Sequence, residues 1–463
     1  GDRAGEARCA GNERGAKQAS RLLEEAGSVE YCAPDFKGPE CQLCAAENHH
    51  LVDGDECKEC APRGAAAALI AGIVFGLCVA CGLAAWAYSM TAWRKKRIIG
   101  PILRFADRSV KYYIGGGMTA KVKILFGFYQ ISTVLSSTYS ARLPEEYTGW
   151  TDRLANAMSI DWSGVFLPEQ CLGYGLRLLT IALSPVALIT LLLGTGIALR
   201  LRRWRAAPPP RPTEASGSGP GPGADTGLVE ASMSMVEASI ASAISAIAEA
   251  INTDESKVSA SHARAWKVEA VLGLLDLTPA GLVLVFCFVP SISASIFRAW
   301  SCQAYTVSPP DEPLRQVSYM RLDASVECGT DKHESITGLA IGFIVLWPAG
   351  SLVLFTSLLI ACSKPLRAKS PNALTKATAF LHREYKKTWY WWEAVELARK
   401  LVLTGFVLLI PEERAFVRLV VATLVCSFYA VVLAVVRPYK RVEDDVLAVA
   451  TSLALLLLFL GTN

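Results

Sequence analysis

Long runs of apolar side chains constrain this chain more than any other feature of its sequence. Hydrophobic types make up 52% of the residues and charged types 19%, whereas a soluble domain carries about 25% charge. The runs suit helices that cross a ~30 Å hydrocarbon core. We therefore predict an all-α membrane protein, a bundle of about eight transmembrane helices, and exclude a single soluble globule. The runs cover 65–90, 122–143, 172–199, 269–297, 336–361, 397–410, 416–436 and 446–460.

Lysine and arginine collect beside alternate runs, and this sets the expected orientation. Basic clusters follow the first, third, fifth and seventh runs, and such clusters mark cytoplasmic connections. We therefore expect a multi-pass protein of the plasma membrane or an endomembrane, with its N terminus extracellular or lumenal. The net charge of +4 is too small and dispersed for a nucleic-acid partner, so the lipid bilayer is the partner we expect.

The positions of the cysteines support the same orientation, independently of the basic clusters. Nine of them fall on the predicted outer side, where disulfides persist, and five lie in or at the ends of runs: Cys78, Cys81, Cys287, Cys362 and Cys426. The chain begins at Gly1 rather than Met, so we expect further sequence before it. The predicted organisation is a disulfide-stapled extracellular module (1–62), transmembrane helix 1 (63–93), a basic cytoplasmic linker (94–120), helices 2–3 (121–200), a cytoplasmic Pro/Gly/Ser linker with an amphipathic helix (201–265), and helices 4–8 (266–463).

The extracellular module is expected to depend on its cysteines, because its polar sequence offers little core. They are Cys9, Cys32, Cys41, Cys44, Cys57 and Cys60. The two Cys-x2-Cys pairs also have a spacing that suits zinc, but the oxidising location favours disulfides, and six cysteines allow fifteen pairings. In the loop between runs four and five we expect a Cys302–Cys328 disulfide. No partner for Cys171 is evident from the sequence.

Charged residues within the runs are candidates for function. Asp276 lies in the fourth run, three residues before Pro279, and a charge at that depth should face protein or water. It is our candidate for an ion pathway, and the alternative is a helix cap near the cytoplasmic interface. At the start of the sixth run stand Glu393, Glu396, Arg399 and Lys400, spaced for i, i+3 and i, i+4 pairs. They are candidates for gating or coupling, and the alternative is an interfacial anchor.

The cytoplasmic stretch 228–251 carries one apolar stripe at helical spacing, from Val229 to Ile251. This predicts a helix–helix contact, such as a homo-oligomer, or a helix that folds on the chain's own cytoplasmic face. No nucleophile-elbow, zinc-protease or kinase motif appears. We therefore expect a protein that is not an enzyme, with no catalytic residue, no metal site and no cofactor.

Several short motifs support a resemblance. The segment 31–44, with Tyr31-Cys32 and Phe36-x-Gly38-Pro39-x-Cys41-x-x-Cys44, resembles EGF-like and ephrin-receptor-like ectodomain modules, which bind proteins or act as spacers. The segments 121–131, 297–302, 319–328, 390–400 and 437–439 together resemble the TRP-like, TRP C-terminal-type eukaryotic multipass proteins.

The TRP-like resemblance implies conduction or regulation of cation flux. A non-conducting cell-surface receptor or adhesion protein, whose ectodomain binds an extracellular protein, is the alternative. No Gly-rich filter or acidic ring stands between two runs, which departs from the pore loops of channels.

Overall fold

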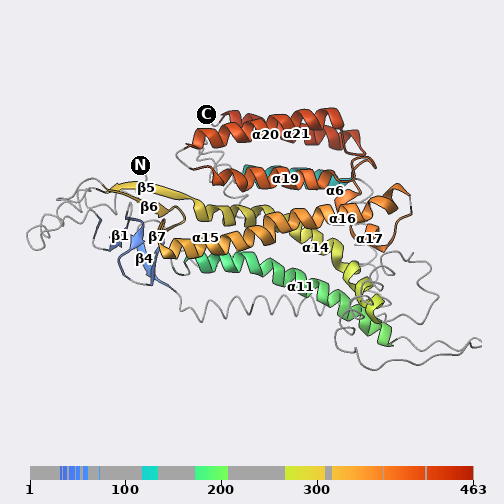
Figure 1. Cartoon of the computed structure of the whole chain (residues 1–463), viewed down its shortest axis with the longest axis horizontal. Coiled ribbons are helices and arrows are strands. Elements are labelled where there is room, and N and C mark those ends of the chain that lie inside the picture. Colours follow the sequence, from blue (N-terminus) through green and yellow to red (C-terminus); the bar gives the residue numbers. More distant parts are fainter. Residues whose placement is uncertain are drawn as a thin grey trace, which may run out of the picture.

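A computed structural model describes 32–60 (except 34, 39–40, 47 and 53–55), 72, 117–133, 171, 173–206, 266–307, 315–368, 370–411 and 414–461. Its main feature is an elongated bundle of helices that lie side by side (Figure 1). Five helical segments in these ranges are long and apolar enough to cross a membrane. The chain is therefore suited to a bilayer, as the apolar runs predict.

The five long segments account for most of the bundle, and two shorter helices pack among them. The fifth-run segment consists of α15 and α16 joined by a π-helical turn, Val345–Ala349, which contains Pro348. The helices are α6 (Met118–Ser132), α11 (Tyr174–Ala206), α14 (Trp266–Phe297), α15 (Asp331–Ile344), α16 (Gly350–Arg367), α17 (Ala373–Ala377), α18 (Ala379–His382), α19 (Trp392–Thr404), α20 (Ala415–Val436) and α21 (Val442–Gly461).

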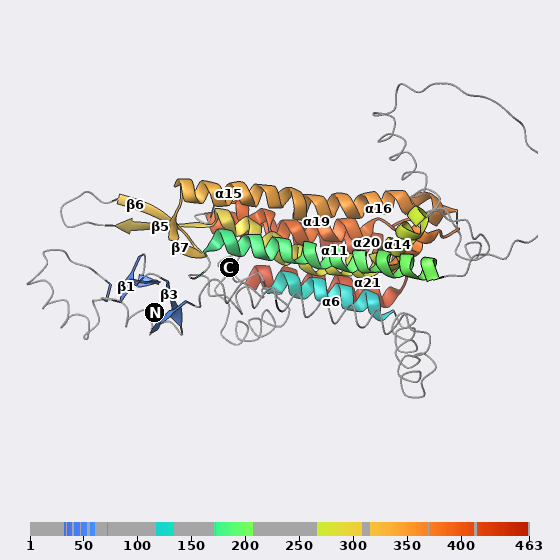
Figure 2. The same ribbon diagram turned by 90° about the horizontal axis from the view of Figure 1, so that it is seen from below.

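The strands lie together at one end of the bundle (Figure 2). Two hairpins come from the N-terminal module, and an antiparallel sheet of order β5-β6-β7 follows α14. We call this the strand end, and the opposite end, with α17 and α18, the loop end. The strands are β1 (Phe36–Lys37), β2 (Leu43–Cys44), β3 (His49–Val52), β4 (Glu56–Glu59), β5 (Cys302–Val307), β6 (Arg315–Met320) and β7 (Asp323–Glu327).

The expected count of eight transmembrane helices is not supported, because five segments qualify within the described ranges. The first expected helix, 65–90, lies outside these ranges apart from Gly72. The second appears as α6, whose described part has 15 residues. The sixth appears as α19, which has 13 residues and gives way at Gly405 to a short 3-10 turn, Phe406–Leu409. Neither reaches the about 20 residues of a simple span.

The short helix α19 nevertheless connects the two ends of the bundle. At the loop end, Tyr385, shortly before α19, forms a β-bridge with Tyr439, which follows α20. At the strand end, the ring of Phe406 lies 4.8 Å from that of Phe297, the last residue of α14. The segment from Trp392 to Leu409 therefore continues from the loop end toward the strand end, with its last part in a 3-10 turn rather than an α-helix.

Disulfides hold the strand end together. Cys32 bonds to Cys41 and Cys44 to Cys57 within the module. Cys60 bonds to Cys171, which directly precedes α11, and Cys302 bonds to Cys328 across the sheet. The four sulfurs of the two Cys-x2-Cys pairs are therefore oxidised rather than arranged around zinc, and Cys171 has the partner that the sequence did not suggest. Cys9 lies outside the described residues.

Helices α11 and α14 approach most closely where two glycines face each other. A Cβ built on Gly273 would lie 2.7 Å from the carbonyl oxygen of Gly196 and 2.9 Å from the Cα of Ile197. Both are backbone atoms that no rotamer change can move. Small residues at such a crossing let two membrane helices pack backbone against backbone.

We expect Gly273→Ala to destabilise the bundle by about 1–3 kcal/mol, the usual cost of overpacking a close contact. The matched control is Gly194→Ala on α11, where an added Cβ meets nothing within 4 Å. Thermal unfolding of the detergent-purified protein should show a lower midpoint for Gly273→Ala and no decrease for Gly194→Ala. Equal midpoints for both variants would contradict a close crossing at this point.

Candidate functional site: a buried charged cluster

Charged side chains of α6 and α19 meet inside the bundle, toward the loop end. Glu393, in the first turn of α19, forms an ion pair with Lys123 of α6, and their side chains are 2% and 10% exposed. The hydroxyl of Tyr385 donates to the same Glu393 oxygen at 3.0 Å, and Lys123 also donates to the carbonyl of Phe380 at 2.9 Å. Glu393 therefore joins α6, α19 and the segment before α19.

A second pair lies one turn further along α19. Arg399 donates to Glu396 at 3.0 Å, and the hydroxyl of Tyr429 on α20 donates to the other oxygen of Glu396. The Arg399 guanidinium also lies over the Tyr429 ring, 4.3 Å from its centroid. Glu396 and Arg399 thus form the i, i+3 pair expected from the sequence, and Tyr429 of α20 contacts both side chains.

Lys400 does not join the i, i+4 ion pair with Glu396 that the spacing suggested. Its residue is 3% exposed, and its ammonium lies 4.0 Å from the ring centroid of Phe286 on α14. A Cβ built on Gly127 of α6 would lie 2.8 Å from this ammonium, so the absence of a side chain at Gly127 makes room for it. Lys400 therefore contacts the ring of Phe286 on α14 and the backbone of α6 at Gly127.

Residues in α21 and just before it add contacts on the side of the cluster that faces the loop end. Lys121 of α6 pairs with Asp444 at 3.2 Å, and the backbone N–H of Tyr439 donates to Asp445 at 3.0 Å. Burial raises the pKa of the Tyr385 and Tyr439 hydroxyls well above the ordinary value. Both tyrosines therefore stay neutral donors, and the connection between α20 and α21 is fixed against the segment before α19.

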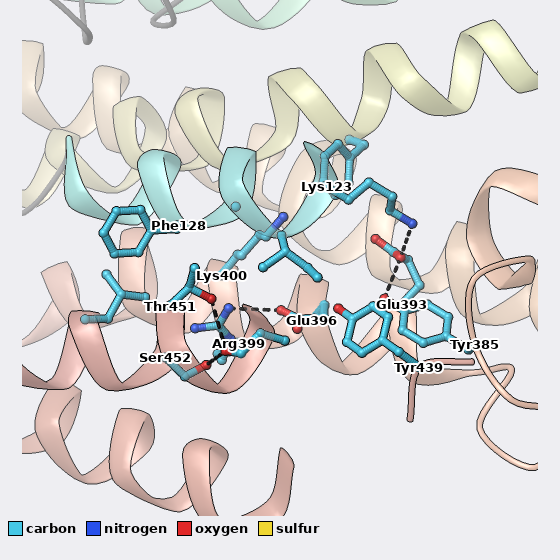
Figure 3. Close-up of a pocket in the computed structure, with 15 residues that line it drawn as sticks. Lys123, Phe128, Tyr385, Glu393, Glu396, Arg399, Lys400, Tyr439, Thr451 and Ser452 are labelled. Atoms are coloured by element: carbon cyan, nitrogen blue, oxygen red, sulfur yellow. Dashed lines mark hydrogen bonds and ion pairs between the residues drawn. The ribbon is translucent and has the colours of Figure 1, made fainter. Parts of the chain in front are cut away.

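A small cavity lies within this cluster (Figure 3). The volume open to the centre of a water molecule is about 20 Å³. Five ionisable side chains that could carry charge at neutral pH line it, together with neutral residues of α6, α14 and α21: Lys123, Glu393, Glu396, Arg399 and Lys400. All four coupling candidates of α19 therefore meet at one place.

Asp276 lies elsewhere. Its carboxylate accepts from Arg200 of α11 at 3.1 Å, and its side chain is 49% exposed. Arg200 also pairs with Glu269 at 2.9 Å, so two acids of α14 share one arginine of α11. The structure thus gives Asp276 a basic partner on the surface of the bundle, while its role in an ion pathway stays a prediction.

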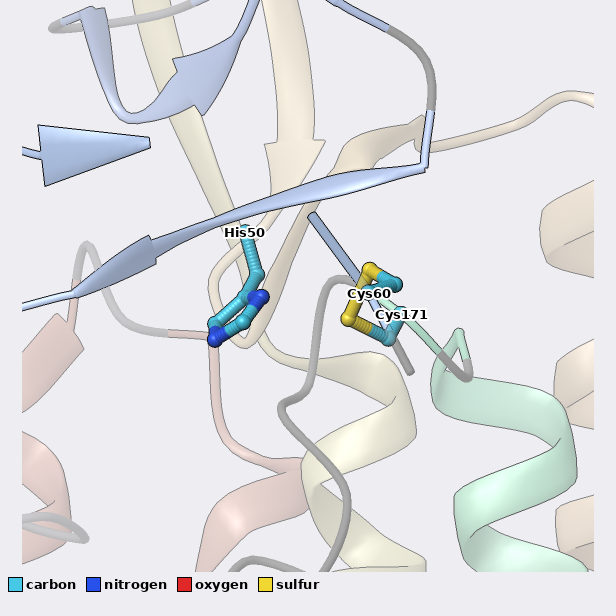
Figure 4. A group of neighbouring side chains, drawn as sticks. All are labelled: His50, Cys60 and Cys171. Carbon is cyan, nitrogen blue, oxygen red and sulfur yellow. A yellow bond between two sulfur atoms is a disulfide. The ribbon is translucent and has the colours of Figure 1, made fainter. Parts of the chain in front are cut away.

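At the strand end, His50 lies beside the Cys60–Cys171 disulfide (Figure 4). His333 stands in a similar relation to Cys302, with 3.8 Å between its Nε2 and the sulfur. Each set places three potential ligand atoms within 4.8 Å of one another. The sulfurs are disulfide-bonded, however, and a metal would need thiolates, so neither set is a metal site in this form.

The sequence singled out the acids and bases of α19 but not their partners. Lys123, Tyr385, Tyr429 and Tyr439 complete the cluster. One signal was available: Lys123 is a charge at the start of an apolar run, and such charges face protein rather than lipid. The stripe at 228–251 and the residues Cys78 and Cys81 lie outside the described ranges.

Comparisons with protein-family models, with curated proteins and with solved structures gave no match. The functional conclusions therefore depend on the chemistry of the chain itself.

Proposed function

We propose that this protein is a TRP-like multipass membrane protein that conducts or regulates cation flux. The observation that carries the proposal is the buried network in which Glu393 and Glu396 bind basic partners from α6 and α19. Charged side chains are expensive to insert into a bilayer and usually mark a functional element. A network that fixes α19 to α6, α20 and the cytoplasmic-side connections is suited to couple those connections to the membrane helices.

The proposed architecture has eight crossings. Cys60 and Cys171 are bonded and therefore lie on one side of the membrane, so the chain between them crosses an even number of times. We assign one crossing to α6 and expect the other in the apolar run 65–90, which lies outside the described residues apart from Gly72. The six remaining crossings are α11, α14, α15–α16, the α19 segment, α20 and α21.

The proposed orientation places the strand end outside the cell or in a lumen. The disulfides gather at that end, and disulfides persist in oxidising compartments. Basic residues gather at the loop end, as in Arg203 and Arg205 of α11 and Lys364 and Arg367 of α16. This is the arrangement that the positive-inside rule favours.

A flux assay tests the proposal. We expect liposomes that contain the purified protein to pass K⁺ or Na⁺ faster than empty liposomes. Glu396→Gln removes the negative partner of Arg399 and should change the rate by about tenfold, since couplings of this kind amount to about 1–3 kcal/mol. Glu56→Gln, at an exposed site of the module, is the control and should leave the rate unchanged. Flux equal to that of empty liposomes would reject conduction.

A non-conducting receptor or adhesion protein is the second candidate, and the Cys60–Cys171 disulfide favours it. This bond joins the N-terminal module to Cys171, three residues before α11, so a protein bound to the module would act close to the start of a membrane helix. Such a receptor would give no flux in the liposome assay. Neither candidate involves catalysis.

A further inference from the structure

The cavity among α6, α14, α19 and α21 is lined by two carboxylates and three cationic side chains. Each carboxylate is engaged: Glu393 accepts from Lys123 and Tyr385, and Glu396 accepts from Arg399 and Tyr429. Both carboxylates of the lining are therefore already committed to donors of the chain itself.

Two cationic side chains have donors without an acceptor in the described residues. The ammonium of Lys400, on a residue that is 97% buried, lies over the Phe286 ring and makes no hydrogen bond to the part of the chain described. The Nε–H of Arg399 is buried and has no partner there either. Buried donors without acceptors are costly and call for a partner.

The charges of the lining residues favour an occupant that carries a negative charge. Three cations and two carboxylates line the cavity, which leaves one positive charge when Lys400 is protonated. The neighbouring acids Asp444 and Asp445 lie outside the lining and pair with Lys121 and Lys386. A buried charge needs a counter-charge, so an occupant that accepts hydrogen bonds and carries a single negative charge fits the site.

The size of the cavity restricts this occupant. The 20 Å³ open to the centre of a water molecule exceeds only slightly the ~10–15 Å³ that one water needs. A phosphate, a sulfate or a lipid headgroup has several heavy atoms and is too large. A metal cation would meet the Lys400 ammonium and the net positive charge of the lining and be repelled.

We propose that this cavity is a binding site for one monatomic anion of the size of chloride, held by the Lys400 ammonium. The anion neutralises the surplus charge among α6, α14 and α19 and so stabilises their packing. The inference does not depend on cation conduction, since it concerns binding among the helices of the bundle.

The test is thermal unfolding of the purified full chain in sodium chloride, sodium bromide and sodium gluconate at equal ionic strength. Chloride and bromide should raise the midpoint by a few degrees over gluconate, in a saturable manner, because ligand binding to the native state stabilises it. Lys400→Met should abolish this difference. Lys387→Met, at an exposed lysine of the loop end, is the matched control and should keep it.

Gly127→Ala is the second variant. It keeps every charge, but its added Cβ would lie 2.8 Å from the Lys400 ammonium and displace it, so the halide effect should weaken. A wild-type midpoint that is the same in all three salts would overturn the proposal, and the surplus donors would then be met by water beside a neutral Lys400. A halide effect that persists unchanged in both Lys400→Met and Gly127→Ala would also overturn it.

Discussion

Replacing Glu393 with leucine should destabilise the protein by about 3–5 kcal/mol, the usual loss when one member of a buried ion pair is removed. The Lys123 and Glu393 side chains are only 10% and 2% exposed, so the variant would leave Lys123 buried without its ion-pair partner. The hydroxyl of Tyr385 would lose its acceptor as well. The midpoint of thermal unfolding of the detergent-purified protein measures the effect.

The double variant Lys123→Met/Glu393→Leu tests whether the stability effect comes from the interaction between these two side chains. Removal of both charges leaves no unpaired buried ion, so the double variant should recover much of the stability that Glu393→Leu loses. Glu56→Gln is the control, because its pair with Lys58 is mostly exposed and such pairs contribute at most about 1 kcal/mol. A double variant as unstable as the sum of the two single variants would show that the two side chains are not coupled.

The long helices could be predicted from the sequence because their signal is local. A run of apolar residues specifies both the helix and its contact with lipid, and α11, α14, α15–α16, α20 and α21 fall on predicted runs. Helix α19 shows the limit of that rule. Its first nine residues include Glu393, Glu396, Arg399 and Lys400. Their partners Lys123 and Tyr429, which are far away in the sequence, make these charges compatible with the bundle.

The environment of Asp276 could not be predicted for a related reason. The sequence places an acid within an apolar run, but the close approach of α11 and α14 at Gly196 and Gly273 brings Arg200 to it. This crossing depends on two glycines 77 positions apart, and no periodicity connects them. The pairing of Cys60 with Cys171 was equally hidden, since fifteen pairings of the six module cysteines were open and the actual partner lay outside that set.

Removal of the Cys60–Cys171 disulfide should destabilise the protein more than removal of any other disulfide in the described residues. The bond closes a loop with a sequence separation of 111, and in the loop-entropy model such a bond contributes about 4.8 kcal/mol. The Cys32–Cys41 bond has a separation of 9, for which the same model gives about 2.6 kcal/mol. The double serine variant at 60 and 171 should therefore lose about 2 kcal/mol more than that at 32 and 41.

The two double variants can be compared by chemical unfolding of the purified protein. The Cys60→Ser/Cys171→Ser variant has a further expected effect, because the module is then no longer bonded to the segment just before α11. Limited proteolysis should release the module from this variant and leave it attached in the wild type, while Cys32→Ser/Cys41→Ser keeps the attachment. Equal losses of stability and equal proteolysis in the two double variants would mean that contacts other than this bond hold the module to the strand end. The proposal of a receptor would then lose the covalent link on which it depends.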